Sequence, residues 1–160
     1  MSPDPSLPAT EPAGPGLGEL YATEREGLWR LARLLTGSDC TGEDLVQEAF
    51  VRFCSARAEP ANPGGYLRTI VVNLCRDHLR RQARARRQPA PTAPPALPPE
   101  VDETWAAVCR LPFRQRAAVV LRYYQDLPEA EIARVLGCRP GTVKSSLNRA
   151  LASLRKELSG

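Results

Sequence analysis

The sequence predicts an all-α protein with two small helical domains joined by a proline-rich linker. In every segment outside the tail and the linker, apolar residues recur at three- or four-residue spacing, which is the helical period. Residues 89–99, PAPTAPPALPP, hold six prolines in eleven positions and can neither continue a helix nor pair in a sheet. Aromatic residues make up only 6% of the 160 residues, so the core must be built mainly from Leu, Val and Ala.

The chain begins with a segment that predicts disorder. Residues 1–16 contain five prolines among glycines and small polar residues, and we expect a disordered tail there. The first domain then spans residues 17–88, and its first helix stops at Gly37. The apolar face of this helix is formed by Leu17, Leu20, Tyr21, Leu28, Leu31, Ala32 and Leu35.

The second helix is predicted to begin at Thr41, because Asp44 follows three residues later in a pattern like a capping box. Its apolar face comprises Leu45, Ala49, Phe50, Phe53 and Cys54. Its outer face carries the polar residues Glu43, Asp44, Gln47 and Glu48. Pro60, Pro63, Gly64 and Gly65 predict a loop. A third helix is predicted from about Tyr66 to Arg87. Its inward-facing residues are Leu67, Ile70, Val71, Leu74 and Leu79. Its outer face carries Tyr66, Thr69, Asn73, Arg76 and Arg80.

The second domain, residues 100–158, is predicted to hold four shorter helices. The first contains Val101, Trp105 and Val108, and Pro112 opens the second, where Ala117, Val120, Leu121 and Tyr124 face inward. Pro128 opens the third and Gly137 ends it, with Ile132, Ala133 and Leu136 inside. The last runs from Thr142 to about Leu158, with Val143, Leu147, Leu151, Leu154 and Leu158 inside.

The third and fourth of these helices predict a helix-turn-helix. Ala133 is small enough for two helices to cross closely, Gly137 can adopt the left-handed turn conformation, and Val143 fills the angle between the helices. Lys144, Ser145, Asn148 and Arg149 fall opposite the apolar stripe of the last helix. Donors near the start of such a helix can reach base edges and phosphates in the major groove. A plain helical hairpin is the simpler interpretation of the spacing alone.

Charge and cysteine content narrow the range of functions that the sequence allows. The net charge of +4 is uneven, because residues 66–88 carry +6 and residues 112–158 carry +5. Two basic zones in a small chain favour two contacts with a polyanion, and a solvated basic surface is the alternative. The five cysteines include no CxxC pair, which favours reduced thiols, and Cys75 with His78 cannot close a zinc site. We expect no metal, cofactor, membrane insertion or catalytic centre.

Four strings in order resemble a known family. They are LVQEAFVRF, YLRTIVVNLCRDHLRR, LPFRQRAAVVLRYYQDLPEAEIARVLG and GTVKSSLNRALASLRKEL. Together they resemble the extracytoplasmic-function (ECF) sigma factors of bacterial RNA polymerase, especially the actinobacterial SigE-like branch. The resemblance covers about residues 17–158.

For the first domain, the resemblance implies sigma domain 2, which docks on the clamp helices of the polymerase β′ subunit. Asp44, Leu45, Gln47 and Glu48 fall in the clamp-binding stretch. The third helix matches the segment that reads the minus-ten element, with Asn73, Asp77 and Arg80 on its N-x₃-D-x₂-R pattern. Tyr66, Thr69 and Arg76 share its outer face. The loop 55–65 matches the segment that captures a flipped minus-ten base.

For the second domain, the resemblance implies sigma domain 4, which binds the β flap and reads the minus-thirty-five element. Its reading residues would be Thr142, Lys144, Ser145, Asn148 and Arg149. The linker would thread the RNA exit region. The implied partners are core RNA polymerase and promoter DNA, with an anti-sigma factor as a further candidate, and the implied location is the cytoplasm, at the nucleoid.

Two positions depart from the family pattern. Tyr66 stands where many members carry Trp, so its ring could stack on a base or pack in the core. Ser146 stands where the family usually has Arg, which removes one candidate DNA contact.

Two other functions are alternatives to a sigma factor. A free-standing transcriptional regulator would share the helix-turn-helix but leaves LVQEAF and the N-x₃-D-x₂-R pattern unexplained. A metal-dependent nuclease could use Glu43, Asp44 and Glu48, but these lie along one helix without converging ligands from elsewhere.

Overall fold

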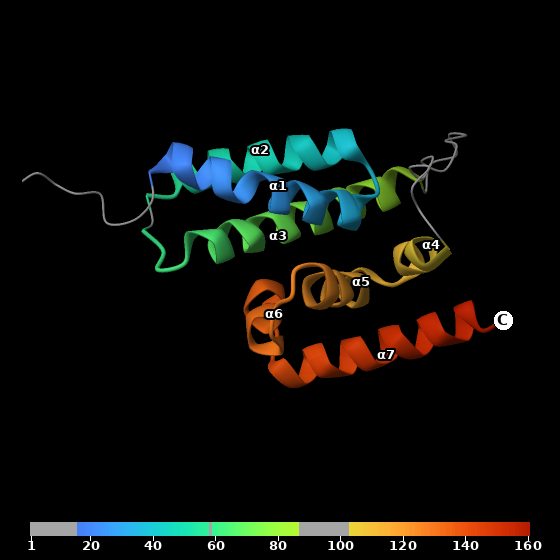
Figure 1. The fold of residues 1–160 in the computed structure, drawn as a ribbon. Coiled ribbons are helices and arrows are strands. Elements are labelled where there is room, and N and C mark those ends of the chain that lie inside the picture. Colours follow the sequence, from blue (N-terminus) through green and yellow to red (C-terminus); the bar gives the residue numbers. More distant parts are fainter. Residues whose placement is uncertain (1–15, 58, 87–102) are drawn as a thin grey trace, which may run out of the picture.

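The computed structural model describes residues 16–57, 59–86 and 103–160, and all the secondary-structure elements in this part of the chain are helices (Figure 1). The all-α prediction is confirmed. The first module contains α1 (Leu17–Thr36), α2 (Asp39–Ser55) and α3 (Pro63–Arg86). The second contains α4 (Glu103–Arg110), α5 (Phe113–Val119), the π-helical turn η1 (Val120–Tyr124), α6 (Glu129–Leu136) and α7 (Pro140–Leu158). The predicted tail 1–16, apart from Gly16, and the linker 89–99 lie outside the described residues.

The first module is a three-helix bundle whose core is aliphatic. Leu31 and Leu35 of α1 and Leu67 and Val71 of α3 are completely buried. α1 ends as predicted at Gly37, whose φ of 76° is left-handed and whose amide donates to the Arg33 carbonyl over 2.7 Å. Glycine adopts this conformation without the steric penalty that a side chain would bring.

The starts of α2 and α3 correct two expectations. α2 begins at Asp39, because Ser38 is its N-cap and the Ser38 Oγ accepts a 3.2 Å bond from the Thr41 amide. The predicted Thr41 cap is therefore wrong. α3 begins at Pro63 rather than Tyr66, because the Asn62 Oδ1 accepts a 3.0 Å bond from the Gly65 amide. A proline at the first helical position costs no hydrogen bond, so it opens this helix rather than preventing it.

The second module departs from expectation at two side chains. α5 continues into the π-helical turn η1, which rotates Tyr124 away from the inner face and leaves it 53% exposed, with its ring edge-on to Trp105 at 6.1 Å. Leu158, also expected inside, is 47% exposed at the last residue of α7. Ala117, Val120, Ile132, Val143 and Leu147 are buried as predicted.

The two modules pack against each other. α6 lies beside α3, and η1 lies beside α1 (Figure 1). The Arg116 guanidinium donates across the boundary to the carbonyl of Leu35 at the end of α1 over 2.8 Å. Gln125 also donates its side-chain amide to the Gly27 carbonyl over 3.4 Å. None of the helices in the described ranges is both long and apolar enough to cross a membrane.

Candidate polymerase and nucleic-acid interfaces

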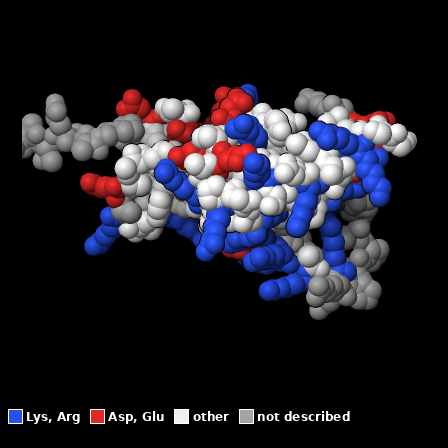
Figure 2. Space-filling model, turned by 90° about the horizontal axis from the view of Figure 1, so that it is seen from below, with Lys and Arg blue, Asp and Glu red and all other residues white. Residues whose placement is uncertain are grey.

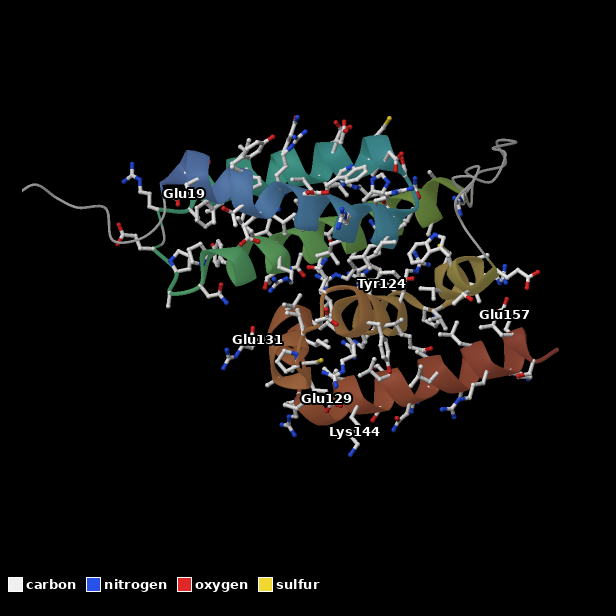
Figure 3. All side chains as sticks on the ribbon, viewed as in Figure 1. Glu19, Tyr124, Glu129, Glu131, Lys144 and Glu157 are labelled. Carbon is white, nitrogen blue, oxygen red and sulfur yellow. The ribbon has the colours of Figure 1, made fainter. Side chains whose placement is uncertain are left out.

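The helix-turn-helix is formed by α6, a tight turn and α7. Gly137 ends α6 with a φ of 65°, and its amide donates to the Arg134 carbonyl over 3.3 Å. α7 then buries Val143 and Leu147 against the module core. The opposite stripe, formed by Lys144, Ser145, Asn148 and Arg149, is exposed, and Figure 3 shows Lys144 extending away from the molecule near the start of α7. The predicted orientation of these side chains is confirmed.

A hollow beside this stripe adds residues that the sequence analysis missed. Its volume is about 490 Å³, and it brings Arg114 and Gln115 of α5 next to Thr142 and Arg149 of α7, with Arg139 at the turn. The Gln115 Oε1 is buried without a hydrogen-bond partner in the part of the chain that the structure describes. Ser146 also lines this hollow but is only 8% exposed. Arg114 lies at the start of α5, where a positive charge is unfavourable because it opposes the helix dipole. This unfavourable position could have marked Arg114 in the sequence as a candidate contact for a phosphate.

The outer face of α3 is less open than predicted. Thr69 donates its hydroxyl to the Gly65 carbonyl of its own helix over 3.1 Å, and the Tyr66 ring lies edge-on to Phe53 at 5.8 Å. Asn73 and Arg76 are half-buried, whereas Asp77 and Arg80 are exposed. The Arg76 Nε lies 3.9 Å from the Asp77 carboxylate. The face therefore does not form one solvated stripe.

The outer face of α2 presents the predicted polar residues. Asp44, Gln47 and Glu48 are exposed, and the Glu48 carboxylate accepts a 3.0 Å bond from the Arg52 guanidinium. Leu45 is only 8% exposed and packs in the core, so it supports this surface from below and does not present a side chain to a partner. Gln47 also lines a groove of about 550 Å³ between α1 and α2, which contains Trp29.

Charge is separated over the surface. In the view from below, Lys and Arg side chains lie mainly in the lower half of the molecule, and Asp and Glu lie mainly in the upper half (Figure 2). Large basic areas of this kind favour association with a polyanion.

The ionisable groups of α3 do not form a reactive centre. Burial raises the pKa of the Cys75 thiol from 9.0 to about 12, so this thiol stays neutral. Burial, with the nearby Arg81 charge, lowers the pKa of His78 below its ordinary value. Within the described ranges, no three His, Cys, Asp or Glu side chains are placed to hold a metal ion. The five cysteines are not paired in disulfides.

Comparison with known proteins decides the family. Residues 20–85 match the family described as Sigma-70 region 2, and residues 102–154 match Sigma-70, region 4. The chain is 37% identical over 153 residues to the ECF RNA polymerase sigma factor SigM of Mycobacterium tuberculosis, covering 88% of this chain and 76% of the relative. The chain belongs to the ECF RNA polymerase sigma factors.

Other relatives agree with this assignment. The ECF sigma factor SigE of Mycolicibacterium smegmatis is 35% identical over 161 residues, and the match covers 91% of this chain but 63% of that relative's length. The RNA polymerase sigma-E factor of Streptomyces avermitilis is 33% identical over 150 residues, covering 88% of this chain and 83% of the relative. The resemblance to an actinobacterial SigE-like branch is thereby confirmed.

Solved structures show the same fold. The sigma factor RpoE of Bartonella quintana, in complex with the anti-sigma factor NepR, matches with a TM-score of 0.72 and 22% identity over 89% of this chain and 96% of that chain. CnrH, in complex with the cytosolic domain of CnrY, matches with a TM-score of 0.68 and 26% identity over 89% and 87% of the two chains.

Family membership distinguishes between the three functions that the sequence suggests: a sigma factor, a free-standing regulator and a nuclease. Sigma factors are transcription initiation factors that direct RNA polymerase to promoters, and they are not enzymes. A free-standing regulator is not favoured, because the match to region 2 covers the segments that such a regulator leaves unexplained. A nuclease is not favoured either, because Glu43, Asp44 and Glu48 share one exposed helix face.

Proposed function

We propose that this chain binds core RNA polymerase through the outer face of α2 and selects promoters through α3 and α7. The observation that carries the proposal is that one chain presents two separate polar surfaces, the α2 face and the outward stripe of the helix-turn-helix. A polymerase subunit and a promoter can therefore be engaged at the same time. Asp44, Gln47 and Glu48 would contact the β′ clamp helices, with Leu45 holding their helix in place.

The stripe of α7 would read the minus-thirty-five element. Arg149 can donate two hydrogen bonds to a guanine edge, and Lys144 can serve a base or a phosphate. Thr142, in the first turn of α7, can position a phosphate with its hydroxyl, and Ser145 and Asn148 complete the reading surface. The neighbouring Arg114 and Arg139 would add phosphate contacts that fix the register of α7 on the duplex.

The outer face of α3 would read the minus-ten element through Asn73, Arg76, Asp77 and Arg80. The half-buried Tyr66 and Thr69 lie nearer the start of the helix, beside the loop that we propose receives a flipped base. The ring contact of Tyr66 with Phe53 fixes the ring in one orientation, which suits a stacking surface as well as a core residue.

The domain division follows from this assignment. Residues 17–88 would act as sigma domain 2 and residues 100–158 as sigma domain 4, bound to the β flap, with 89–99 as the connecting linker and 1–16 as a dispensable tail. A cytoplasmic, nucleoid-associated location fits these roles. The solved complexes of RpoE with NepR and of CnrH with CnrY support an anti-sigma factor as a further partner.

Binding to core polymerase, compared with binding to DNA alone, tests the proposal. We expect the purified chain to co-elute with core RNA polymerase in size-exclusion chromatography and to bind promoter duplexes tightly only in that complex. Each small domain alone offers few contacts, and the polymerase would hold both in register. Tight, sequence-specific duplex binding by the chain alone at physiological salt, without binding to core polymerase, would instead support a free-standing regulator.

A further inference from the structure

The first turn of α3 has no negative charge of its own. Pro63, Gly64 and Gly65 open this helix, and its first turn contains no acidic residue. The other two helices of the module carry Glu19 and Asp39 in their first turns. An acid at this place stabilises a helix, because the aligned peptide dipoles leave partial positive charge at its start.

Glu24 of α1 brings a carboxylate to the start of α3. It interrupts the core-facing stripe of α1 between the buried Leu20 and Leu28, and it is half-buried. The two helices lie side by side (Figure 1), and the Glu24 Oε1 lies 2.8 Å from the point where a Cβ would stand on Gly64. The missing side chain of Gly64 therefore makes room for the carboxylate. Partial burial of a carboxylate is unfavourable, and the positive end of α3 offsets this cost.

The turn that Glu24 contacts also orients residues that we assign to base capture. Asn62 ends the loop before α3, and its Oδ1 and carbonyl oxygen accept 3.0 Å bonds from the amides of Gly65 and Tyr66. The Tyr66 ring in turn lies edge-on to Phe53 at 5.8 Å. A displacement of the first turn of α3 would therefore move the end of the loop and the Tyr66 ring together.

We propose that Glu24 is a positioning residue for minus-ten recognition, because its carboxylate holds the first turn of α3, the end of the preceding loop and Tyr66 where a flipped base is received. The proposal rests on the assignment of this loop and of α3 to the minus-ten element. Glu24 acts through α3 in this role and touches no base. Its removal should weaken the capture of one base and leave the other promoter contacts intact.

Moving the carboxylate from α1 to α3 tests this role. Glu24→Ala removes the charge and clears the space beside Gly64. Adding Gly64→Asp returns a carboxylate from the first turn of α3 itself, and adding Gly64→Asn returns a side chain of the same shape without the charge. The backbone admits either side chain, because the φ of Gly64 is not in the left-handed region. Glu19→Ala removes the first-turn acid of α1 and serves as control.

The measurement is the affinity of the holoenzyme for a forked promoter DNA, in which each unpaired minus-ten base is replaced in turn by an abasic site. The promoter is one selected by in vitro transcription. Loss of the captured base should weaken binding by the unmodified holoenzyme about tenfold, as for loss of one stacked base. We expect Glu24→Ala, alone or with Gly64→Asn, to lose most of this difference. Glu24→Ala with Gly64→Asp should recover it, and Glu19→Ala should keep it.

Urea denaturation of the same chains separates positioning from stability. If Glu24→Ala lowers the free energy of unfolding but keeps the full difference between intact and abasic DNA, Glu24 has only a structural role and the proposal is wrong. Equal recovery with Gly64→Asn and Gly64→Asp would also overturn it, because the charge would then play no part. These two double variants decide the question even if Glu24→Ala alone does not fold.

A failure of the proposed function has a different signature. If no abasic site weakens binding by the unmodified holoenzyme, the assignment of the loop and α3 to the minus-ten element is wrong, and the role of Glu24 falls with it. If one abasic site does so and the Glu24 variants respond to it as the unmodified chain does, only the role of Glu24 is wrong.

Discussion

Arg149 is the side chain of α7 best suited to reading a base, because it is exposed on the outward stripe and borders the hollow shared with Thr142 and Arg114. We expect Arg149→Ala to weaken holoenzyme binding at the cognate minus-thirty-five element by about 1–3 kcal/mol and to relax preference at one base position. Arg155→Ala removes an exposed arginine further along the same helix and serves as control.

The measurement is holoenzyme affinity for single-base minus-thirty-five variants at two salt concentrations. A residue that only contacts phosphate would weaken all sequences alike and lower the salt slope by about one ion. If Arg149→Ala keeps the full base preference and loses only uniform affinity, Arg149 positions the helix and does not read the base.

The buried Cys75 predicts an alkaline loss of stability. Its pKa in the fold, about 12, lies above the ordinary 9.0, so folding favours the neutral thiol. The resulting stabilisation is complete below pH 9 and is lost as the pH rises from 9 toward 12. We expect the free energy of unfolding to fall by roughly 1 kcal/mol between pH 8 and pH 10 through this group.

Urea unfolding at the two pH values checks this expectation. Cys75→Ala should show a smaller fall than the unmodified chain, whatever the substitution costs at pH 8. Cys54→Ala, at an exposed cysteine, should keep the pH dependence of the unmodified chain. The same pH dependence in all three chains would show that the Cys75 thiol is not the group responsible.

Single residues show where sequence reasoning succeeds and where it stops. The outward stripe of α7 could be predicted, because Lys144 and Arg149 are placed by the apolar spacing of their own helix. The half-burial of Asn73 and Arg76 could not, because it depends on α5 and α6 from the other module. Tyr124 was misplaced because one π-helical turn changes the register of the residues after Val119.

Helix starts are decided by capping, and α2 offers a direct test. Ser38→Ala should lower the free energy of unfolding by about 0.5–2 kcal/mol, because the Thr41 amide loses its half-buried acceptor at the start of α2. Thr41→Ala, at the cap predicted from the sequence, should have the smaller effect. Urea denaturation of the two variants compares them, and a larger loss for Thr41→Ala would contradict the cap seen in the structure.

The role of the outer face of α2 in binding polymerase can be tested by changing two of its exposed side chains together. Gln47→Ala with Glu48→Lys should abolish co-elution with core RNA polymerase, because the pair loses a hydrogen-bonding amide and reverses the charge opposite a basic partner. The folded state should persist, since both side chains are exposed. Circular dichroism and urea denaturation check this.

A matched change elsewhere on the same module is the control. Gln82→Ala with Glu19→Lys makes the same chemical changes at exposed positions of α3 and α1 and should leave co-elution intact. Unchanged co-elution of the α2 variant would show that the polymerase contact lies on another surface.

At the level of elements, the order and type of the helices could be predicted from apolar spacing, with Gly37 and Gly137 as stops. The boundaries at Asp39 and Pro63 could not, because several residues near each start can act as cap or turn. Only the fold shows that Ser38 and Asn62 accept the first amide bonds.

At the level of the whole molecule, the sequence predicts two modules but contains no local signal for their packing. The contacts of Arg116 with Leu35 and of Gln125 with Gly27 join residues far apart in the chain. The structure therefore adds that the two candidate DNA-reading surfaces differ. The stripe of α7 is exposed, whereas the face of α3 is partly covered by the second module.

At this scale, the proposed role of the chain is to give core RNA polymerase its promoter specificity. In vitro transcription with core polymerase, with and without the chain, on a pooled library of genomic promoter fragments tests it most directly. We expect new transcripts only when the chain is present, from fragments that share one minus-thirty-five and one minus-ten sequence, and loss of these transcripts with Gln47→Ala/Glu48→Lys. Identical transcripts with and without the chain would show that the chain does not direct promoter choice.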